Sequence, residues 1–155
     1  MKIKFVFYDK EKHGDTLKKL NEEFDFRRYL NVRGGDIYTP EEGRDYINVV
    51  AVSANKKIVY GFCFSEHYGD GSVQVKSVYV LEKYRGKGIA GKLLKEIENR
   101  ILNSWKVPEL YGFTLENKTM EKIFMDNGYN LMGVFKRFAF VNGRYHDQSF
   151  FAKYF

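Results

Sequence analysis

The sequence has one cysteine, two prolines and no apolar run long enough to cross a bilayer. A single cysteine, Cys63, excludes a disulfide within the chain and suits a reducing compartment. Because Cys63 lies in a strand-like apolar stretch, we expect a buried structural thiol and not a nucleophile. The first residues alternate as in a strand and lack the long apolar centre of a cleavable signal. These features predict a cytoplasmic protein with no membrane partner.

Low-complexity tracts and Lys/Arg-rich tracts are also missing. The net charge is +6, but the 26 basic residues are spread along the chain and do not alternate with aromatic residues in one segment. A basic protein that binds nucleic acid usually gathers its cations on one face or element. We therefore expect no nucleic-acid partner and interpret the charge as a field that favours an anionic cofactor. The length of 155 residues predicts a single domain over residues 1–155, and no metal site is predicted.

The most informative stretch is Val73–Arg100, which predicts a strand, a glycine-rich turn and a helix. Residues 73–80 are mainly β-branched or aromatic, as in a largely buried strand. Three glycines within residues 85–91 let the backbone bend tightly and approach a ligand closely. The apolar stripe of the following helix comprises Ile89, Ala90, Leu93, Leu94, Ile97 and Ile101. Free backbone N–H groups at this helix start, flanked by Arg85 and Lys87, predict an anion site with a phosphate as its occupant.

This turn differs from the two common nucleotide motifs. A Walker loop ends in Lys-Ser/Thr, which is absent. Residues 86–91 satisfy Gly-x-Gly-x-x-Gly, but no acidic residue ends a following parallel strand at the required distance. Arg85, Gly88 and Ala90, after a strand that ends in Val80, instead closely resemble the acyl-CoA-binding motif of the GNAT superfamily of N-acetyltransferases. The resemblance implies that the turn wraps the pyrophosphate of coenzyme A.

The remaining elements are similar in order to those of the same family. We expect a strand, two helices, three strands, a helix, a strand, a helix and a hairpin. This is a mixed α/β fold with a central, mostly antiparallel sheet flanked by about four helices. The first helix is expected after an N-cap at Asp15, and a short second helix from Thr39-Pro40-Glu41-Glu42 to about Tyr46. Residues 39–42 and 143–147 resemble the branch that includes ribosomal-protein and phosphinothricin acetyltransferases.

The resemblance implies transfer of the acetyl group of acetyl-CoA to a primary amine, by direct attack within a ternary complex. The amine would belong to a peptide N-terminus or a small molecule. A backbone N–H near Val80 would stabilise the oxyanion. Asn117 would hydrogen-bond the cofactor's amides, a role compatible with capping the helix that it opens. The residues expected to contact the cofactor are Val78, Tyr79, Val80, Arg85, Gly86, Lys87, Gly88, Ile89, Ala90, Gly91, Asn117 and Phe124.

Two positions depart from the family pattern. Phe124 stands where the usual general acid is a tyrosine, and Lys76 stands where a glutamate base is common. A thiol with a pKa near 8.5 leaves readily as a thiolate, so losing the acid would slow the reaction without preventing it. Glu66 and His67, near the end of the neighbouring strand, are the candidates to replace the base.

Two alternative functions follow from the same residues. Phe124 and Lys76 favour a non-catalytic acyl-CoA-binding or sensing module on the same fold. The basic composition leaves a nucleic-acid-binding protein as a third hypothesis, behind the other two. The acceptor amine and the choice between a monomer and a homodimer stay open.

Overall fold

The computed structural model describes residues 2–23, 43–141 and 143–155. Its elements are, in chain order, β1 (Ile3–Phe7), α1 (Lys10–Glu23), β2 (Tyr46–Ser53), β3 (Val59–His67), β4 (Ser72–Val80), the 3₁₀ helix η1 (Glu82–Tyr84), α3 (Ile89–Ser104), β5 (Glu109–Leu115), α4 (Lys118–Asp126), β6 (Asn130–Val141) and β7 (Arg144–Tyr154). The strands form one sheet in the order β1-β2-β3-β4-β5-β7-β6. Within this sheet of described strands, β4 and β5 pair in parallel and the other neighbours are antiparallel.

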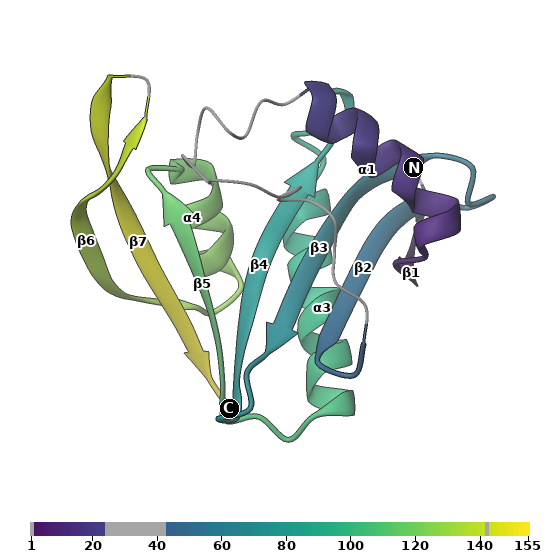
Figure 1. Cartoon of the computed structure of the whole chain (residues 1–155). Coiled ribbons are helices and arrows are strands. Elements are labelled where there is room, and N and C mark those ends of the chain that lie inside the picture. Colours follow the sequence, from purple (N-terminus) through teal and green to yellow (C-terminus); the bar gives the residue numbers. More distant parts are fainter. Residues whose placement is uncertain (1, 24–42, 142) are drawn as a thin grey trace.

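The helices cover the two faces of this sheet. Helix α1 lies on one face, while α3 and α4 lie on the other (Figure 1). The seven-stranded mixed sheet confirms the predicted fold class. None of the helices within the described ranges is long and apolar enough to cross a membrane.

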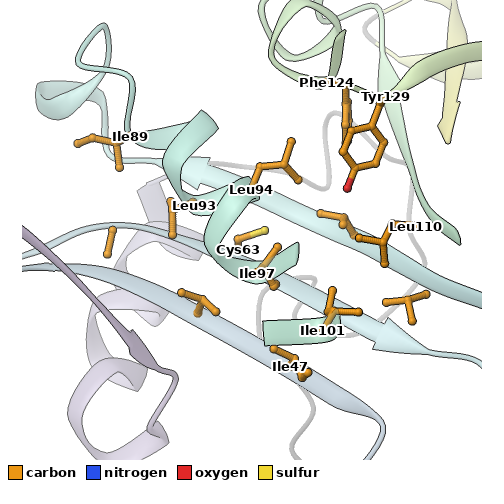
Figure 2. Packing of buried hydrophobic residues seen from close by; sticks show 14 of the residues in the cluster. Ile47, Cys63, Ile89, Leu93, Leu94, Ile97, Ile101, Leu110, Phe124 and Tyr129 are labelled. Carbon is orange, nitrogen blue, oxygen red and sulfur yellow. The ribbon is translucent and has the colours of Figure 1, made fainter. Parts of the chain in front are cut away.

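The main core lies between α3 and the central strands. The α3 side chains with 1% exposure or less are Ile89, Leu93, Leu94, Ile97 and Ile101, as the apolar spacing predicts. They pack onto inward-facing residues of β2, β3 and β4, including Val49, Cys63 and Val75. Figure 2 shows this packing, with Phe124 and Tyr129 side by side next to α3. A second, smaller core joins Leu17 of α1 to the opposite face of the sheet.

The start of α1 corrects one sequence prediction. The helix begins at Lys10, five residues before the expected cap at Asp15. Asp9 provides the cap, since its Oδ1 accepts the backbone N–H of Lys12 at 3.2 Å. His13 therefore lies inside the helix and is 6% exposed.

The number of helices is a second correction. The described residues contain three α-helices and one short 3₁₀ helix, where about four helices were expected. The expected helix from Thr39-Pro40-Glu41-Glu42 begins outside the described residues. Its expected last residues are not helical, because residues 43–45 form a bend and turn and Tyr46 begins β2. Pairing of Tyr46 with Glu66 of β3 extends the sheet to this point.

Candidate functional site

The parallel strands β4 and β5 separate toward their C-terminal ends and form a fork. β4 and β5 pair from Ser72 and Glu109 to Val75 and Gly112, and their registered pairing ends there. On its other side, β4 stays paired with β3 as far as Val80. Among the described residues, 76–80 therefore have no strand partner on the side of β5. Figure 1 shows the two strands diverging toward their C-terminal ends. An unpaired strand edge of this kind can bind an extended ligand through its backbone.

The glycine-rich turn follows the open end of this fork. Gly86 and Gly88 have φ values of 73° and 69°, a left-handed conformation that glycine adopts without strain. A Cβ atom at either position would meet no other atom within 4 Å, so the space beside the turn is open. Gly88 is the N-cap of α3, and no side chain of the described residues caps the helix there. The first amides of α3 are thus available to an anion.

Two basic side chains are held against this turn. The Arg85 guanidinium donates from Nε to the Val80 carbonyl at 3.0 Å and from Nη2 to Tyr79 Oη at 3.3 Å. Lys87 Nζ lies 5.6 Å from the centre of the Tyr84 ring. Arg85 has five N–H donors, so these two bonds leave others for a ligand. The turn and its cations form a site that suits a phosphate group.

Glu66 lies near the closed end of the fork. Its carboxylate accepts hydrogen bonds from Lys76 Nζ at 2.6 Å, Tyr68 Oη at 3.1 Å and Tyr46 Oη at 3.3 Å. The bond from Lys76 is the main reason why the pKa of Glu66 falls below its usual value, and the two tyrosines add to this effect. The carboxylate therefore stays ionised at neutral pH. Although Lys76 takes the position expected for a base, it brings a carboxylate from the neighbouring strand to that position.

His67 lies apart from this group. Successive residues of a strand point to opposite faces, so Glu66 and His67 of β3 face different sides of the sheet. The His67 ring packs 5.0 Å from the ring of Trp105, which directly follows the C-terminal end of α3. The glycine-rich turn is at the other end of this 16-residue helix, about 24 Å away along its axis. Of the two candidate bases, only Glu66 joins Lys76 and the tyrosines.

A row of aromatic rings continues from Glu66 across the fork. Tyr68 and Tyr111 have ring centres 6.5 Å apart, Tyr111 and Phe113 5.8 Å, and Phe113 and Phe150 5.1 Å. Burial and the bond to Glu66 raise the pKa of Tyr68 to about 12, so this phenol remains a donor. No local sequence pattern placed the rings of β5 and β7 beside Glu66. Their proximity depends on strand register, which no local pattern predicts.

The two aromatic residues at the end of α4 lie in the core. Phe124 is 2% exposed, and its ring packs 4.9 Å from that of Tyr129 and 5.3 Å from that of Phe151. A Cβ atom at Gly112 would lie 2.5 Å from Phe124 Cζ, so the ring abuts the backbone of β5. Tyr129 is 3% exposed, and burial raises the pKa of its phenol. Neither ring presents a proton donor at the surface of the fork.

Asn117 caps the helix that it opens. Its Oδ1 accepts the backbone N–H of Met120 at 3.0 Å, at the start of α4. This confirms the capping role, which is compatible with a contact from the rest of the amide group to a cofactor. The contact to a cofactor itself stays a prediction.

A cavity of about 590 Å³ opens near Glu66, on the side of β1 and α1. It is lined by Phe7, Tyr8, Asp9, Lys10, Glu11, Gly43, Tyr46 and Asn48. Tyr46 belongs to both sites, since its hydroxyl donates to the Glu66 carboxylate. The volume lies within the range of small-molecule sites.

Comparisons with known proteins agree with this arrangement. A family model described as an acetyltransferase (GNAT) domain matches residues 44–131, which is more than half of the chain. A search of curated protein sequences found no match.

Several solved structures share the fold over nearly the whole chain. A candidate acetyltransferase from Acinetobacter baylyi ADP1 has a TM-score of 0.83 at 20% identity, covering 99% of this chain and 93% of that one. The phosphinothricin acetyltransferase of Sinorhizobium meliloti, in complex with AcCoA, has a TM-score of 0.79 at 18% identity, and the match covers 99% of this chain and 89% of that one. NAA60 of Arabidopsis thaliana, in complex with a bisubstrate analogue, has a TM-score of 0.76 at 17% identity, and the match covers 99% of each chain.

At these identities the solved structures show a shared fold, while the family model extends from the end of the turn before β2 to the first residues of β6. That range contains the fork, the glycine-rich turn and the Glu66 cluster. From the match over this range, the chain belongs to the GNAT acetyltransferase family.

Proposed function

We propose that this protein transfers the acetyl group of acetyl-CoA to a primary amine within a ternary complex. One observation carries the proposal: the open edge of β4 leads, through the short helix η1, to a left-handed glycine turn at the uncapped start of α3. An extended acyl-pantetheine arm and a pyrophosphate need these two features next to each other. The S. meliloti relative, named as a complex with AcCoA, supports this choice of cofactor.

The residues of the turn fit the phosphate part of such a cofactor. Gly86 and Gly88 leave open space where any other residue would place a Cβ atom. Ile89 is 1% exposed, so its contribution to binding is its backbone N–H and not its side chain. Arg85 and Lys87 supply positive charge beside these amides.

The backbone of β4 fits the pantetheine part. Residues 78–80 pair with β3 on one side only, and their other edge faces the fork. An extended arm along this edge would accept and donate backbone hydrogen bonds as a strand does. When bound, acetyl-CoA supplies an activated thioester; the chain supplies orientation, a backbone N–H for the oxyanion and a site for the amine.

Glu66 is the residue that we assign to the incoming amine. A lysine-like ammonium is neutral in only about one molecule in a few thousand at pH 7, so the site must accept its proton. The Glu66 carboxylate stays ionised and is the only acid within hydrogen-bond distance of Tyr46, Tyr68 and Lys76 among the described residues. It can accept a hydrogen bond or a proton from the ammonium, directly or through water.

The surroundings of Glu66 favour an amine with an apolar body. Its single charge is already matched by Lys76, which leaves no surplus of negative charge for a polyamine. The rings of Tyr68, Tyr111 and Phe113 extend from it along the sheet. A peptide N-terminus or a small aromatic amine would match both features.

A thermal-shift titration tests the cofactor site first. Acetyl-CoA should raise the melting temperature in a concentration-dependent way and more than adenosine diphosphate does, because only the whole cofactor reaches the fork. An amine screen that measures thiol release then tests the reaction. No stabilisation by millimolar acetyl-CoA would refute the proposal at its first step.

The second candidate function is a non-catalytic acyl-CoA-binding module. Two observations favour it: Phe124 is a buried ring without a proton donor, and Glu66 is bound by Lys76. This function predicts the same stabilisation by acetyl-CoA, but no thiol release above the rate without enzyme for any amine. Turnover with one amine would exclude it.

A further inference from the structure

Lys76 is the extra residue of a β-bulge in the central strand β4. In the register of β3 and β4, Val75 lies opposite Ser65. The next registered pair is Ser77 with Phe64, so the pairing passes over Lys76. A bulge of this kind adds one residue to a single strand and redirects its side chain, often next to an active site. The bulge thus distinguishes Lys76 from the other exposed lysines of the described chain.

The bulge turns Lys76 to the same side of the sheet as Glu66. The β4 side chains that pack in or against the main core are odd-numbered before the bulge and even-numbered after it: Val73, Val75, Val78 and Val80. Glu66 lies on the other side, because it is two residues from Phe64 of the smaller core. Lys76 reaches the same side, where its Nζ is 2.6 Å from Glu66 Oε2. The side chain of Lys76 is 46% exposed, so its ammonium lies at the surface of the fork.

Lys76 also marks the point where the fork begins. Registered pairing of β4 with β5 ends at Val75, so Lys76 is the first residue of the open edge. The glycine-rich turn lies beyond the other end of that edge, after Val80 and η1. An acyl-pantetheine arm that starts at this turn and follows residues 78–80 runs back along β4 and brings its thioester toward Lys76. Two residues of a strand span ~7 Å, so the four-carbon side chain of Lys76 extends to the region next to Val78.

Lys76 already occupies the position that we assign to the incoming amine. Its side chain ends in a primary amine, and this amine is hydrogen-bonded to the Glu66 carboxylate. An amine held within the same molecule has a far higher effective concentration at the thioester than a free acceptor has. We therefore propose that Lys76 is a self-acetylation site, at which the protein acetylates its own Nζ from bound acetyl-CoA. This inference rests on the proposed function of the fork.

The reaction breaks one carbon–sulfur bond and forms one carbon–nitrogen bond. The Lys76 ammonium gives a first proton to Glu66, which passes it to water, and the neutral nitrogen attacks the carbonyl carbon of the thioester. The bond to sulfur then breaks, and the thiolate of CoA takes up the second proton that the nitrogen loses. The products are an acetyl amide on Lys76, free CoA and one proton in solvent. The amide carries no charge, so the ion pair with Glu66 is lost.

Two other lysines provide an internal comparison. Lys122 and Lys136 are likewise 2.8 Å and 2.7 Å from carboxylates, but their side chains are more exposed than that of Lys76, at 72% and 76%. Neither belongs to β4 or to the turn that follows it. Chemical acetylation in solution should modify these two exposed lysines first. Transfer within the fork should instead modify Lys76 first.

Mass spectrometry of the full chain, incubated with acetyl-CoA and no added amine, tests the inference. One acetyl group should appear per chain, and peptide mapping should place it on Lys76 before Lys122 and Lys136. The rate constant should not change with protein concentration, because donor and acceptor belong to one complex. Glu66→Gln should slow the reaction at least about tenfold. Lys76→Arg keeps a positive charge beside Glu66 and should abolish the fast acetylation while acetyl-CoA still raises the melting temperature.

Acetyl phosphate is the control donor, since it acetylates amines without using the fork. It should modify Lys122 and Lys136 at least as fast as Lys76. Equal rates at the three lysines with acetyl-CoA, or a preference for Lys76 with acetyl phosphate as well, would overturn the inference. Stabilisation by acetyl-CoA without acetylation of Lys76 would overturn this inference alone and leave the proposed cofactor site in place. No stabilisation by acetyl-CoA would refute the proposed function and the inference together.

Discussion

Lys153 Nζ on β7 lies 2.8 Å from Glu98 Oε2 on α3, although 55 positions separate the two residues in the chain. Glu98 is 5% exposed, and the same ammonium also donates to the Asn127 carbonyl at 2.8 Å. Helix α3 packs mainly on β2, β3 and β4, whereas β7 pairs with β5. The ion pair therefore connects the two halves of the molecule that diverge at the fork.

We expect Lys153→Met to lower the free energy of unfolding by about 3 kcal/mol, because it leaves a buried carboxylate without its ammonium. Urea denaturation at pH 7 measures this change. Lys122→Met is the matched control: its partner Asp126 is 2.8 Å away, but both side chains are exposed, so the loss should be at most about 0.5 kcal/mol. The double variant Glu98→Leu with Lys153→Met should recover most of the loss. Equal effects of Lys153→Met and Lys122→Met would contradict the role of the buried pair.

Gly88→Ala tests the glycine-rich turn. The left-handed φ of 69° should cost an alanine about 1 kcal/mol of stability. The new methyl group would also project into the open space beside the turn, and we expect acetyl-CoA affinity, measured by calorimetry, to fall at least about tenfold, or 1.4 kcal/mol. Gly71→Ala has the same type of φ, at 91°, and equally open surroundings in another turn. It should cost similar stability and leave the affinity unchanged; a parallel loss of affinity would argue against a phosphate site at Gly88.

Phe124→Tyr would put back the proton donor that the family usually has at this position. A Cβ atom at Gly112 would lie 2.5 Å from Phe124 Cζ, so the para position of the Phe124 ring faces the backbone of β5. We expect the added hydroxyl to overpack this contact, to lower stability by about 1–3 kcal/mol and to give no gain in kcat. Chemical denaturation and thiol-release kinetics measure the two effects. Phe113→Tyr, at a partly exposed ring, is the control and should be nearly neutral. A rise in kcat for Phe124→Tyr would show that the hydroxyl reaches the thioester.

Glu66→Gln should change the pH dependence of stability. The pKa of Glu66 in the folded protein lies below its ordinary value of 4.5, mainly because of Lys76. The ionised carboxylate therefore stabilises the fold above pH 4.5, and this contribution is lost as the pH falls through the lowered pKa. At pH 7 the free energy of unfolding of wild type should exceed that of Glu66→Gln by about 1 kcal/mol or less, and this difference should shrink below pH 4.5. Thermal melting from pH 3 to 8 measures it, and a difference that grows at low pH would have the wrong sign.

The same variant separates the two candidate functions. If Glu66 accepts the proton of the amine, Glu66→Gln should lower kcat by about 10²–10⁴ and leave acetyl-CoA affinity unchanged. Wild-type kcat/KM should rise with pH between 6 and 9 as the free amine becomes more abundant, without an acid limb near pH 5, because Glu66 is already ionised there. An unchanged kcat in Glu66→Gln would remove this residue from the proposed mechanism.

Local patterns predicted much of the fold. The β-branched run of β4, the apolar stripe of α3 and the turn at Gly143 between β6 and β7 appear where the sequence places them. The start of α1 was missed because two acidic residues, Asp9 and Asp15, could each cap a helix, and only the bond from Lys12 to Asp9 distinguishes them. The candidate site divides in the same way. The glycine-rich turn is one continuous segment, so a local pattern was enough to single it out. The Glu66 cluster and the Phe113–Phe150 ring contact join different strands, so no local pattern predicted them.

The sequence by itself determined the elements whose residues are neighbours in the chain: the strand-turn-helix unit of β4 and α3, and with it the family. Glycine conformations, caps and apolar periodicity act within a few residues, so they can be recognised without knowing the fold. Tertiary structure alone decided that β4 and β5 separate after Val75, that Lys76 meets Glu66, and that Lys153 reaches Glu98. Each of these relationships depends on strand register and on the packing of α3 against the sheet, which bring distant segments together only when the whole chain has folded.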